Sequence, residues 1–191
     1  ITGYGPWVAS MEAIGATAAS VVAGAGLVKN MVFKTEVLPI AAALTGVVPL
    51  GVCLLFVGGL LMAQGDAPSW HAGLIAVVVA IQFALIAALG FFLAAATVFV
   101  RDVSVVLPNA LMLFLFATPI FYPIESAPGL LQLVSRANPF YILAEGYRAA
   151  LVFHRPPGAG GLVYVACLAG GLGWLGLRVF RRVKGYFEGL L

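Results

Sequence analysis

The feature that most restricts the fold of this chain is a set of long apolar runs that carry no charge. Residues 38–62 and 73–100 contain no Lys, Arg, Asp or Glu. A helix needs about 20 apolar residues to cross the hydrocarbon of a bilayer, and both runs exceed that length. Hydrophobic residues make up 63% of the chain and charged residues 9%, whereas soluble domains carry about 25% charged residues. The solvent of this protein is therefore predicted to be lipid.

Five segments are long enough, or nearly so, to cross a membrane as helices: residues 7–28, 38–62, 73–100, 104–121 and 161–180. Before the last of them, Pro128 and Pro139 interrupt residues 124–152. Each half of this segment holds about a dozen residues, which is too short to cross. The segment therefore favours a re-entrant or interfacial helical hairpin, whose backbone polar groups are satisfied inside its helices.

We therefore expect an all-α, polytopic membrane helix bundle that forms a single transmembrane domain over residues 1–191. The chain starts at Ile1, inside an apolar segment, with no Met and no basic leader. This start favours an N-terminally truncated chain, so that the five spans present belong to a protein of six.

The basic residues predict how the bundle is oriented. If the five spans alternate, seven of the ten Lys and Arg residues fall on one side, which comprises residues 28–37, the 101–102 turn and the end of the chain including the 181–191 tail. The positive-inside rule assigns that side to the cytoplasm. The C-terminus is then cytoplasmic and residues 122–153 lie on the outer side. A net charge of +3 is too small and too scattered for a nucleic-acid surface.

The sequence gives no support for catalysis or metal binding. It contains no phosphate-binding GxxxxGK[ST] loop, no HExxH pair and no GxSxG nucleophile turn. His71 and His154 flank different spans, where the simplest interpretation is an interfacial side chain. Cys53 and Cys167 stand alone in apolar runs and are interpreted as small hydrophobic residues. We expect no metal and no cofactor on this chain.

Residues 29–39 are amphipathic and lie between two predicted spans, with Met31, Val32 and Phe33 placed between charged residues. One interpretation is a plain cytoplasmic loop. The other is a short interfacial helix that docks into the groove of a partner protein. Residues 101–102, an Arg-Asp pair, begin the next turn on the same side. Asp102 is expected to stabilise the start of the following helix, because the helix dipole favours a carboxylate there.

Charged and aromatic side chains meet in the predicted hairpin. Glu145 and Arg148 are three residues apart on a predicted helix, so their side chains are expected to pair. Ionisable groups at membrane depth are costly and tend to face cavities or partners. The nearby aromatic residues fit an interfacial belt or a surface on which a sugar chain stacks; they are Phe114, Phe116, Phe121, Tyr122, Phe140, Tyr141 and Tyr147.

Four segments in this order resemble the permease subunits of bacterial ABC-type polysaccharide exporters, which export O-antigen or teichoic acid and belong to the type-2 ABC permease class. The first segment is residues 27–44. The second begins at the Phe-x-Arg-Asp-Val turn, residues 99–103, and runs to the Phe-Tyr-Pro break at 121–123. The third is the Asn-Pro-Phe step at 138–140 with its predicted helix, and the fourth is the last span with its basic end. The resemblance covers nearly the whole chain.

The resemblance implies an N-terminally truncated permease of the bacterial inner membrane that forms a homodimer around a channel for a lipid-linked glycan. It implies a separate ATP-binding cassette subunit that carries the ATP and Mg²⁺. The residues implied to contact that subunit are Lys29, Asn30, Phe33, Lys34, Glu36, Arg101 and Asp102. Those implied to line the substrate pathway at the outer exit are Phe121, Tyr122, Phe140, Tyr141, Glu145, Tyr147 and Arg148. Family members often carry Pro-Arg-Glu at positions 34–36, of which only Glu36 is present here.

Three alternatives remain beside the polysaccharide exporter. The first is an exporter of the same class whose cargo is a drug or a lipid, because such exporters share the overall plan. The second is a membrane scaffold that transports nothing. The third is a membrane-bound enzyme, against which the absence of a polar catalytic set argues.

Overall fold

The computed structural model describes residues 2–26, 34–65, 70–120, 124 and 129–190, and within them every regular element is a helix. The α-helices are α1 (Tyr4–Ala23), α3 (Val37–Ala43), α4 (Val47–Ala63), α5 (Ile75–Phe99), α6 (Asp102–Ala117), α7 (Gly129–Ala137), α8 (Pro139–Leu151), α9 (Ala159–Val183) and α10 (Phe187–Leu190). The 3₁₀ turns are η1 (Leu44–Gly46), η2 (Trp70–Leu74) and η4 (Lys184–Tyr186). The expected all-α class is confirmed.

Three helical segments in the described part of the chain are long and apolar enough to cross a membrane: Val37–Ala63, Trp70–Phe99 and Ala159–Tyr186. The protein is therefore a multi-pass membrane protein. The first and fourth predicted spans are not among them. Helix α1 has 20 residues, but the charged Glu12 and the polar Ser10, Thr17 and Ser20 reduce its hydropathy. Helix α6 has 16 residues and is apolar but short.

Helix α6 ends four residues before the predicted boundary at Phe121 because of a proline. Thr118, its C-cap, is extended with φ −95° and ψ 127°. The residue that precedes a proline is pushed out of the helical region by the proline ring, and Pro119 follows Thr118 directly. Phe121 itself lies outside the described residues. Within the helix, Pro108 is tolerated, as prolines in membrane helices often are.

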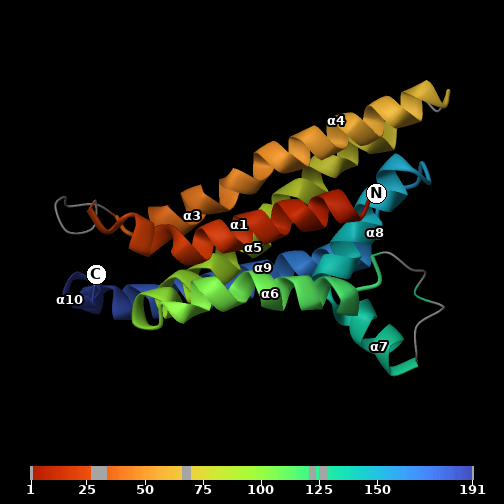
Figure 1. The fold of residues 1–191 in the computed structure, drawn as a ribbon. Helices are drawn as coiled ribbons and strands as arrows, with labels where there is room; N and C mark the ends of the chain where they lie inside the picture. The colour runs from red at the N-terminus through yellow and green to blue at the C-terminus, as the bar shows by residue number, and fades with distance from the viewer. Residues whose placement is uncertain (1, 27–33, 66–69, 121–123, 125–128, 191) are drawn as a thin grey trace.

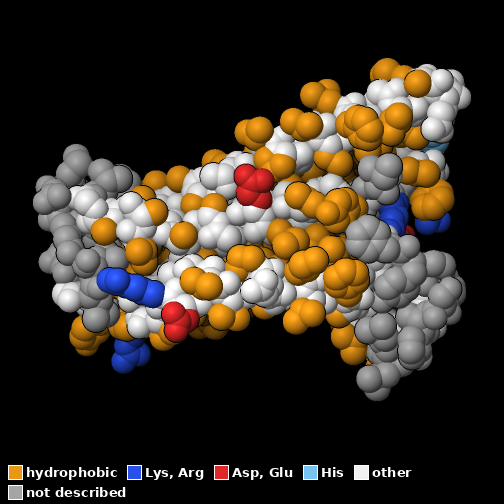
Figure 2. Space-filling view, viewed as in Figure 1, with side chains coloured by type: hydrophobic (Ala, Val, Ile, Leu, Met, Phe, Trp, Pro, Cys, Tyr) orange, Lys and Arg blue, Asp and Glu red, His pale blue; other side chains and the backbone are white. Residues whose placement is uncertain are grey.

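Helix α5 is the centre of the bundle. It packs against α1 and α9, with α3 and α6 beside it, and the long helices run roughly alongside one another in Figure 1. The main core joins α1, α3, α4, α5, α8 and α9, with α6 packed against it; its large buried side chains include Ile14, Leu50, Phe83, Leu85, Ile86, Leu143, Tyr147 and Val165. On the visible side of Figure 2, hydrophobic side chains predominate on the surface between the two ends, one acidic side chain lies among them, and the visible Lys and Arg side chains lie towards the ends. Such an apolar middle belt suits a surrounding of lipid tails.

The two ends of the bundle have different characters. The basic end carries the start of α3, the 101–102 turn, the last turn of α9 and α10 with the C-terminus (Figure 1). The hairpin end carries the N-terminus, η2, and the helix pair α7–α8 (Figure 1). Two helices thus form in the predicted hairpin, with 9 and 13 residues. The predicted assignment of residues 28–37 and 181–191 to the cytoplasmic side and of residues 122–153 to the outer side stays a prediction.

Helices α5 and α9 approach closely at Gly176. A Cβ atom added there would lie 3.1 Å from the carbonyl oxygen of Ala88, 2.9 Å from the Phe92 ring and 3.1 Å from the Cβ of Phe91. Small residues allow such backbone approach in membranes, where packing drives helix association. By contrast, Gly171 on the same helix has nothing within 4 Å of its added Cβ.

We expect Gly176→Val to loosen the α5–α9 contact. Forcing extra methyl groups into a packed contact costs about 1–3 kcal/mol, so the thermal transition of the detergent-solubilised protein should fall measurably. Gly171→Val adds the same side chain to the same helix with no neighbour to meet and is the matched control. Equal transitions for the two variants would contradict this packing.

Candidate functional site

Glu36 joins the start of α3 to the end of α9 at the basic end. Its Oε1 accepts hydrogen bonds from Arg181 Nε at 3.3 Å and from Lys184 Nζ at 3.0 Å. The Glu36 side chain is 13% exposed, whereas those of Arg181 and Lys184 are 61% and 44% exposed. We call this three-residue contact the Glu36 clamp. It links two segments 145 residues apart in sequence.

Electrostatics keep the Glu36 carboxylate charged. Burial raises the pKa of this carboxyl, but a hydrogen bond from its own backbone, the hydrogen bonds from Lys184 and Arg181 and the charge of Lys184 together lower it below its ordinary value. Glu36 is therefore ionised at neutral pH. Because its two partners are largely exposed, solvent screens the pairs, and each contributes at most about 1 kcal/mol to stability. The clamp therefore contributes little to the stability of the fold.

The other described residues of the predicted coupling face lie at the same end. Lys34 is exposed and lines a groove together with the three clamp residues. Arg101 is the N-cap of α6, and Asp102 occupies its first turn, where the expected interaction with the helix dipole is available. Both are exposed. Lys29, Asn30 and Phe33 lie outside the described residues.

An aromatic cluster fixes the C-terminal segment to the bundle. Phe180 and Phe187 are fully buried, and their ring centroids are 5.3 Å apart. Phe180 also packs against Phe91 of α5 at 5.7 Å, and Phe187 against Phe99 at 6.4 Å. Edge-to-face pairs at these distances are favourable. The tail after α9 therefore folds back onto α5 and positions Lys184 beside Glu36.

At the hairpin end, the Asn-Pro-Phe step is the start of α8. Asn138 is extended, as expected before a proline, and its side chain accepts a hydrogen bond from the backbone N–H of Phe140 at 3.0 Å. Asn138 Nδ2 donates to Thr118 Oγ1 at 2.9 Å. An N-cap followed by proline at the first helical position is a strong helix start. This one also fastens α8 to the end of α6.

Arg148 makes a second connection between α8 and the end of α6. Its Nη1 donates to Glu145 Oε1 at 2.8 Å, so the expected pair one turn apart is confirmed. Its Nη2 donates to the carbonyl oxygen of Ile120. The guanidinium thus binds a carboxylate and a carbonyl at once, which a lysine ammonium cannot match in geometry. Arg148 is 23% exposed, so it is partly shielded from solvent.

We expect Arg148→Gln to release α8 from the end of α6. The loss of its two charge-assisted hydrogen bonds, discounted for partial exposure, should cost about 1 kcal/mol. That cost corresponds to an approximately fivefold faster hydrogen exchange of α8 amides. Arg136→Gln removes an exposed arginine from neighbouring α7 and should leave α8 exchange unchanged. Unaltered exchange in Arg148→Gln would show that this connection is not formed.

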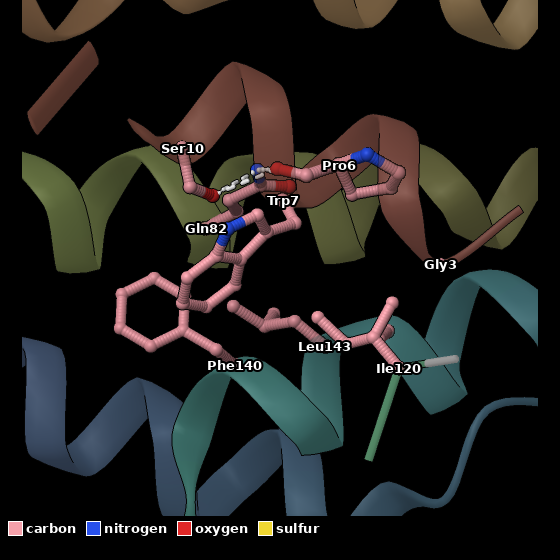
Figure 3. Close-up of a pocket in the computed structure, with 9 residues that line it drawn as sticks. Gly3, Pro6, Trp7, Ser10, Gln82, Ile120, Phe140 and Leu143 are labelled. Atoms are coloured by element: carbon pink, nitrogen blue, oxygen red, sulfur yellow. Dashed lines mark hydrogen bonds between the residues drawn. The ribbon is translucent and has the colours of Figure 1, made fainter. Parts of the chain in front are cut away.

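A buried hydrogen-bond network joins α8, α5 and α1. Tyr147 is fully buried, and its hydroxyl donates to Gln82 Oε1 at 2.5 Å. Gln82 Nε2 donates to the carbonyl oxygen of Pro6 at 2.9 Å and to Ser10 Oγ at 2.8 Å. Ser10 Oγ in turn donates to the Pro6 carbonyl at 2.8 Å. Figure 3 shows Gln82 reaching Ser10 and Pro6. The sequence had placed Tyr147 on the substrate pathway, whereas its ring lies inside the core.

The cavity beside this network is too small for a ligand. Its volume is about 10 Å³, and Trp7, Phe140 and Ile120 close it (Figure 3). That volume is close to the minimum for one water molecule. The rings of Trp7 and Phe140 meet edge to face with centroids 5.3 Å apart, and the Phe114 ring lies 5.7 Å from Trp7 and 6.1 Å from Phe140. Phe140 therefore contributes to a half-buried aromatic cluster between α1, α6 and α8.

A larger cavity of about 380 Å³ lies between α8 and the beginning of α9. Tyr141 and Glu145 line it from α8, and Arg155 lines it from the connection to α9. Gly158 and Gly161 leave room on the α9 side. Two of the predicted pathway residues thus face one cavity, whereas Phe140, Tyr147 and Arg148 make contacts inside the protein. Phe121 and Tyr122 lie outside the described residues.

Sequence reasoning missed the residues that complete both sites. Gln82 carried a signal: it is a single amide in a long apolar helix, and polar groups at membrane depth usually have a specific partner. Arg181 and Lys184 were counted only as basic flanks of the last span. Their contact with Glu36 depends on how the chain folds back, which no local pattern reveals.

Comparison with known proteins gives two matches. Residues 17–152 match the model of the family described as ABC-2 type transporter. The chain is 33% identical over 187 residues to the O-antigen export system permease protein RfbA of Myxococcus xanthus, an alignment that covers 95% of this chain and 71% of that protein.

Proposed function

The chain belongs to the ABC-2 type transporter family, and we propose that it is the transmembrane subunit of an ATP-driven exporter that moves a lipid-linked polysaccharide outward across the bacterial inner membrane. Permeases of this family normally work with a separate ATP-binding cassette subunit. The proposal adds the cargo, the direction of transport, the homodimer and the contact residues. The similarity to an O-antigen export permease carries the cargo assignment.

The proposed orientation places the basic end in the cytoplasm. Lys34, Arg101, Arg181 and Lys184 lie there, and the positive-inside rule favours that placement. The C-terminus is then cytoplasmic. The five spans of the proposed topology include α1 and α6, which are bundled with the three long apolar helices. Helices α7 and α8 form the outer hairpin, whose short helices suit a position that enters the membrane without crossing it.

Coupling to ATP hydrolysis is proposed to act through the Glu36 clamp. The ATP-binding subunit contacts the segment before α3, including Lys29, Asn30, Phe33 and Lys34, together with Arg101 and Asp102 at the neighbouring turn. Since Glu36 holds Arg181 and Lys184, a push on this segment moves α3 and α9 together. ATP and Mg²⁺ are bound by the partner subunit.

The outer exit is proposed to lie at the hairpin end. Tyr141 and Glu145 line the cavity of about 380 Å³, and a tyrosine ring with a carboxylate is a combination that contacts sugar hydroxyls and ring faces well. Tyr122 and Phe121 complete the aromatic surface in this proposal. Membrane lipid surrounds the apolar belt.

Deleting the gene for this permease should stop surface display of the polysaccharide and leave the lipid-linked glycan inside the cell. Complementation with the intact gene should restore display. If display persists in the deletion strain while resistance to a drug or the distribution of a membrane lipid changes, the cargo is a small molecule and the polysaccharide assignment is wrong. If no transported compound changes, the membrane scaffold explains the chain better.

A further inference from the structure

A lateral groove at the basic end combines an apolar floor with a cationic mouth. Its volume is about 580 Å³, and helices α3, α5 and α9 form its walls. Each of these helices belongs to a segment long and apolar enough to cross a membrane. The apolar floor is made by Ala84, Ala87, Ala88, Phe91, Gly173 and Leu177, and Val37 and Ile40 form an apolar rim.

The mouth of the groove carries an excess of positive charge. Lys34, Arg181 and Lys184 supply three cations, and Glu36 supplies one anion, which leaves a net charge of +2. The Glu36 carboxylate already accepts hydrogen bonds from Arg181 and Lys184. Both cations remain largely exposed and have donors left for another acceptor. Lys34 is exposed at the same mouth.

The cationic mouth and the apolar floor follow one another as the head group and the acyl chain of a lipid do in one leaflet. Gly173 lies two turns before Arg181 on α9, a rise of about 12 Å. One leaflet of hydrocarbon is about 15 Å deep. The cations lie at the basic end, and the small residues Ala84, Ala88 and Gly173 leave the space along the floor. Val37 and Ile40 are 44% and 45% exposed at the rim, so the groove opens sideways.

We propose that this groove binds an anionic phospholipid from the leaflet at the basic end. Its phosphate contacts Lys34, Arg181 and Lys184, and an acyl chain lies along Ala84, Ala88 and Gly173. Charge complementarity selects an anionic head group over a zwitterionic one, and the apolar floor selects a lipid over a soluble phosphate. The bound lipid connects the segment before α3 to the end of α9. This inference does not depend on which cargo the protein exports.

The experiment measures phospholipid retained by the permease purified together with its ATP-binding subunit. The complex is exchanged into detergent micelles doped with equal amounts of phosphatidylglycerol and phosphatidylcholine, and bound lipid is counted by native mass spectrometry. We expect retention of phosphatidylglycerol at least fivefold above phosphatidylcholine. Each of Lys34→Gln and Arg181→Gln should reduce it about fivefold, the effect expected for one basic residue at a membrane surface.

Two pairs of variants distinguish a specific lipid site in the groove from general electrostatic attraction of lipid to the basic surface. Arg182→Gln removes the neighbouring exposed cation that does not line the groove and should leave retention unchanged. Ala84→Phe fills the floor without changing charge and should abolish retention of phosphatidylglycerol. Ala166→Phe adds the same ring at an exposed position of α9 outside the groove and should leave retention unchanged.

Three results overturn the proposal. Equal losses in Arg181→Gln and Arg182→Gln indicate diffuse attraction to the surface. Undiminished retention in Ala84→Phe, or equal retention of both phospholipids, shows that the groove is not the binding site. Recovery of a prenyl diphosphate in place of phosphatidylglycerol assigns the groove to a cargo carrier. The charge variants remain decisive if Ala84→Phe fails to fold.

Discussion

Replacing Glu36 with lysine is expected to uncouple ATP hydrolysis from transport. The substitution puts a fourth positive charge beside Lys34, Arg181 and Lys184, so that the start of α3 and the end of α9 repel each other instead of pairing. The partners are exposed enough that the ion pairs contribute at most about 1 kcal/mol, and the chain should still fold. We expect glycan-stimulated ATPase activity of the assembled complex to fall about fivefold, the factor that corresponds to a loss of about 1 kcal/mol.

A charge swap tests whether the pairing itself matters. Glu36→Lys combined with Lys184→Glu restores an opposite-charge pair and should recover most of the stimulated activity. Arg182→Glu reverses a charge at the same end, outside the groove that the clamp residues line, and should leave stimulation unchanged. Normal stimulation in Glu36→Lys, with the protein folded and the subunit bound, would remove the clamp from the coupling mechanism.

Replacing Gln82 with leucine is expected to destabilise the bundle strongly. The change removes three hydrogen bonds and leaves the buried Tyr147 hydroxyl without its acceptor, while Ser10 keeps its hydrogen bond to the Pro6 carbonyl. Hydrogen bonds inside membrane proteins contribute about 0.6 kcal/mol each on average and up to about 1.7 kcal/mol. Three of them predict a loss of about 2–5 kcal/mol in unfolding free energy, read from denaturation in mixed micelles.

Two further variants calibrate that loss. Tyr147→Phe removes one hydrogen bond while keeping the buried ring and should cost about a third as much. Gln64→Leu makes the same exchange at an exposed C-cap of α4 and should be nearly neutral. If Gln82→Leu is as stable as Gln64→Leu, the network contributes nothing to holding α8 against α1 and α5.

The sequence predicted the parts of the fold that depend on local pattern. Long apolar runs place helices correctly over residues 38–62 and 73–100, which carry no charge, and over residues 161–180, where Arg178 is the one charged residue. The pair between Glu145 and Arg148 also follows from nearby residues. The helix start at Asn138 was predictable in principle from the proline that follows it. The early end of α6 was predictable in principle from Pro119.

Contacts between distant segments were not predictable from a single chain. Nothing near Glu36 indicates that Arg181 and Lys184 lie beside it, because the tail must first fold back through Phe180 and Phe187. Tyr147 looked like a member of an aromatic surface. Its burial depends on Gln82, 65 residues away, whose polar side chain needs a partner in the apolar core.

The most direct test of the exporter assignment is the ATPase activity of the permease purified with its ATP-binding subunit, measured with and without lipid-linked glycan. The proposal predicts that the two subunits are recovered together in fixed ratio and that glycan raises hydrolysis several-fold. Recovery of the complex with hydrolysis indifferent to glycan would contradict the polysaccharide cargo. Failure to recover any ATP-binding subunit would contradict ATP-driven export by this chain.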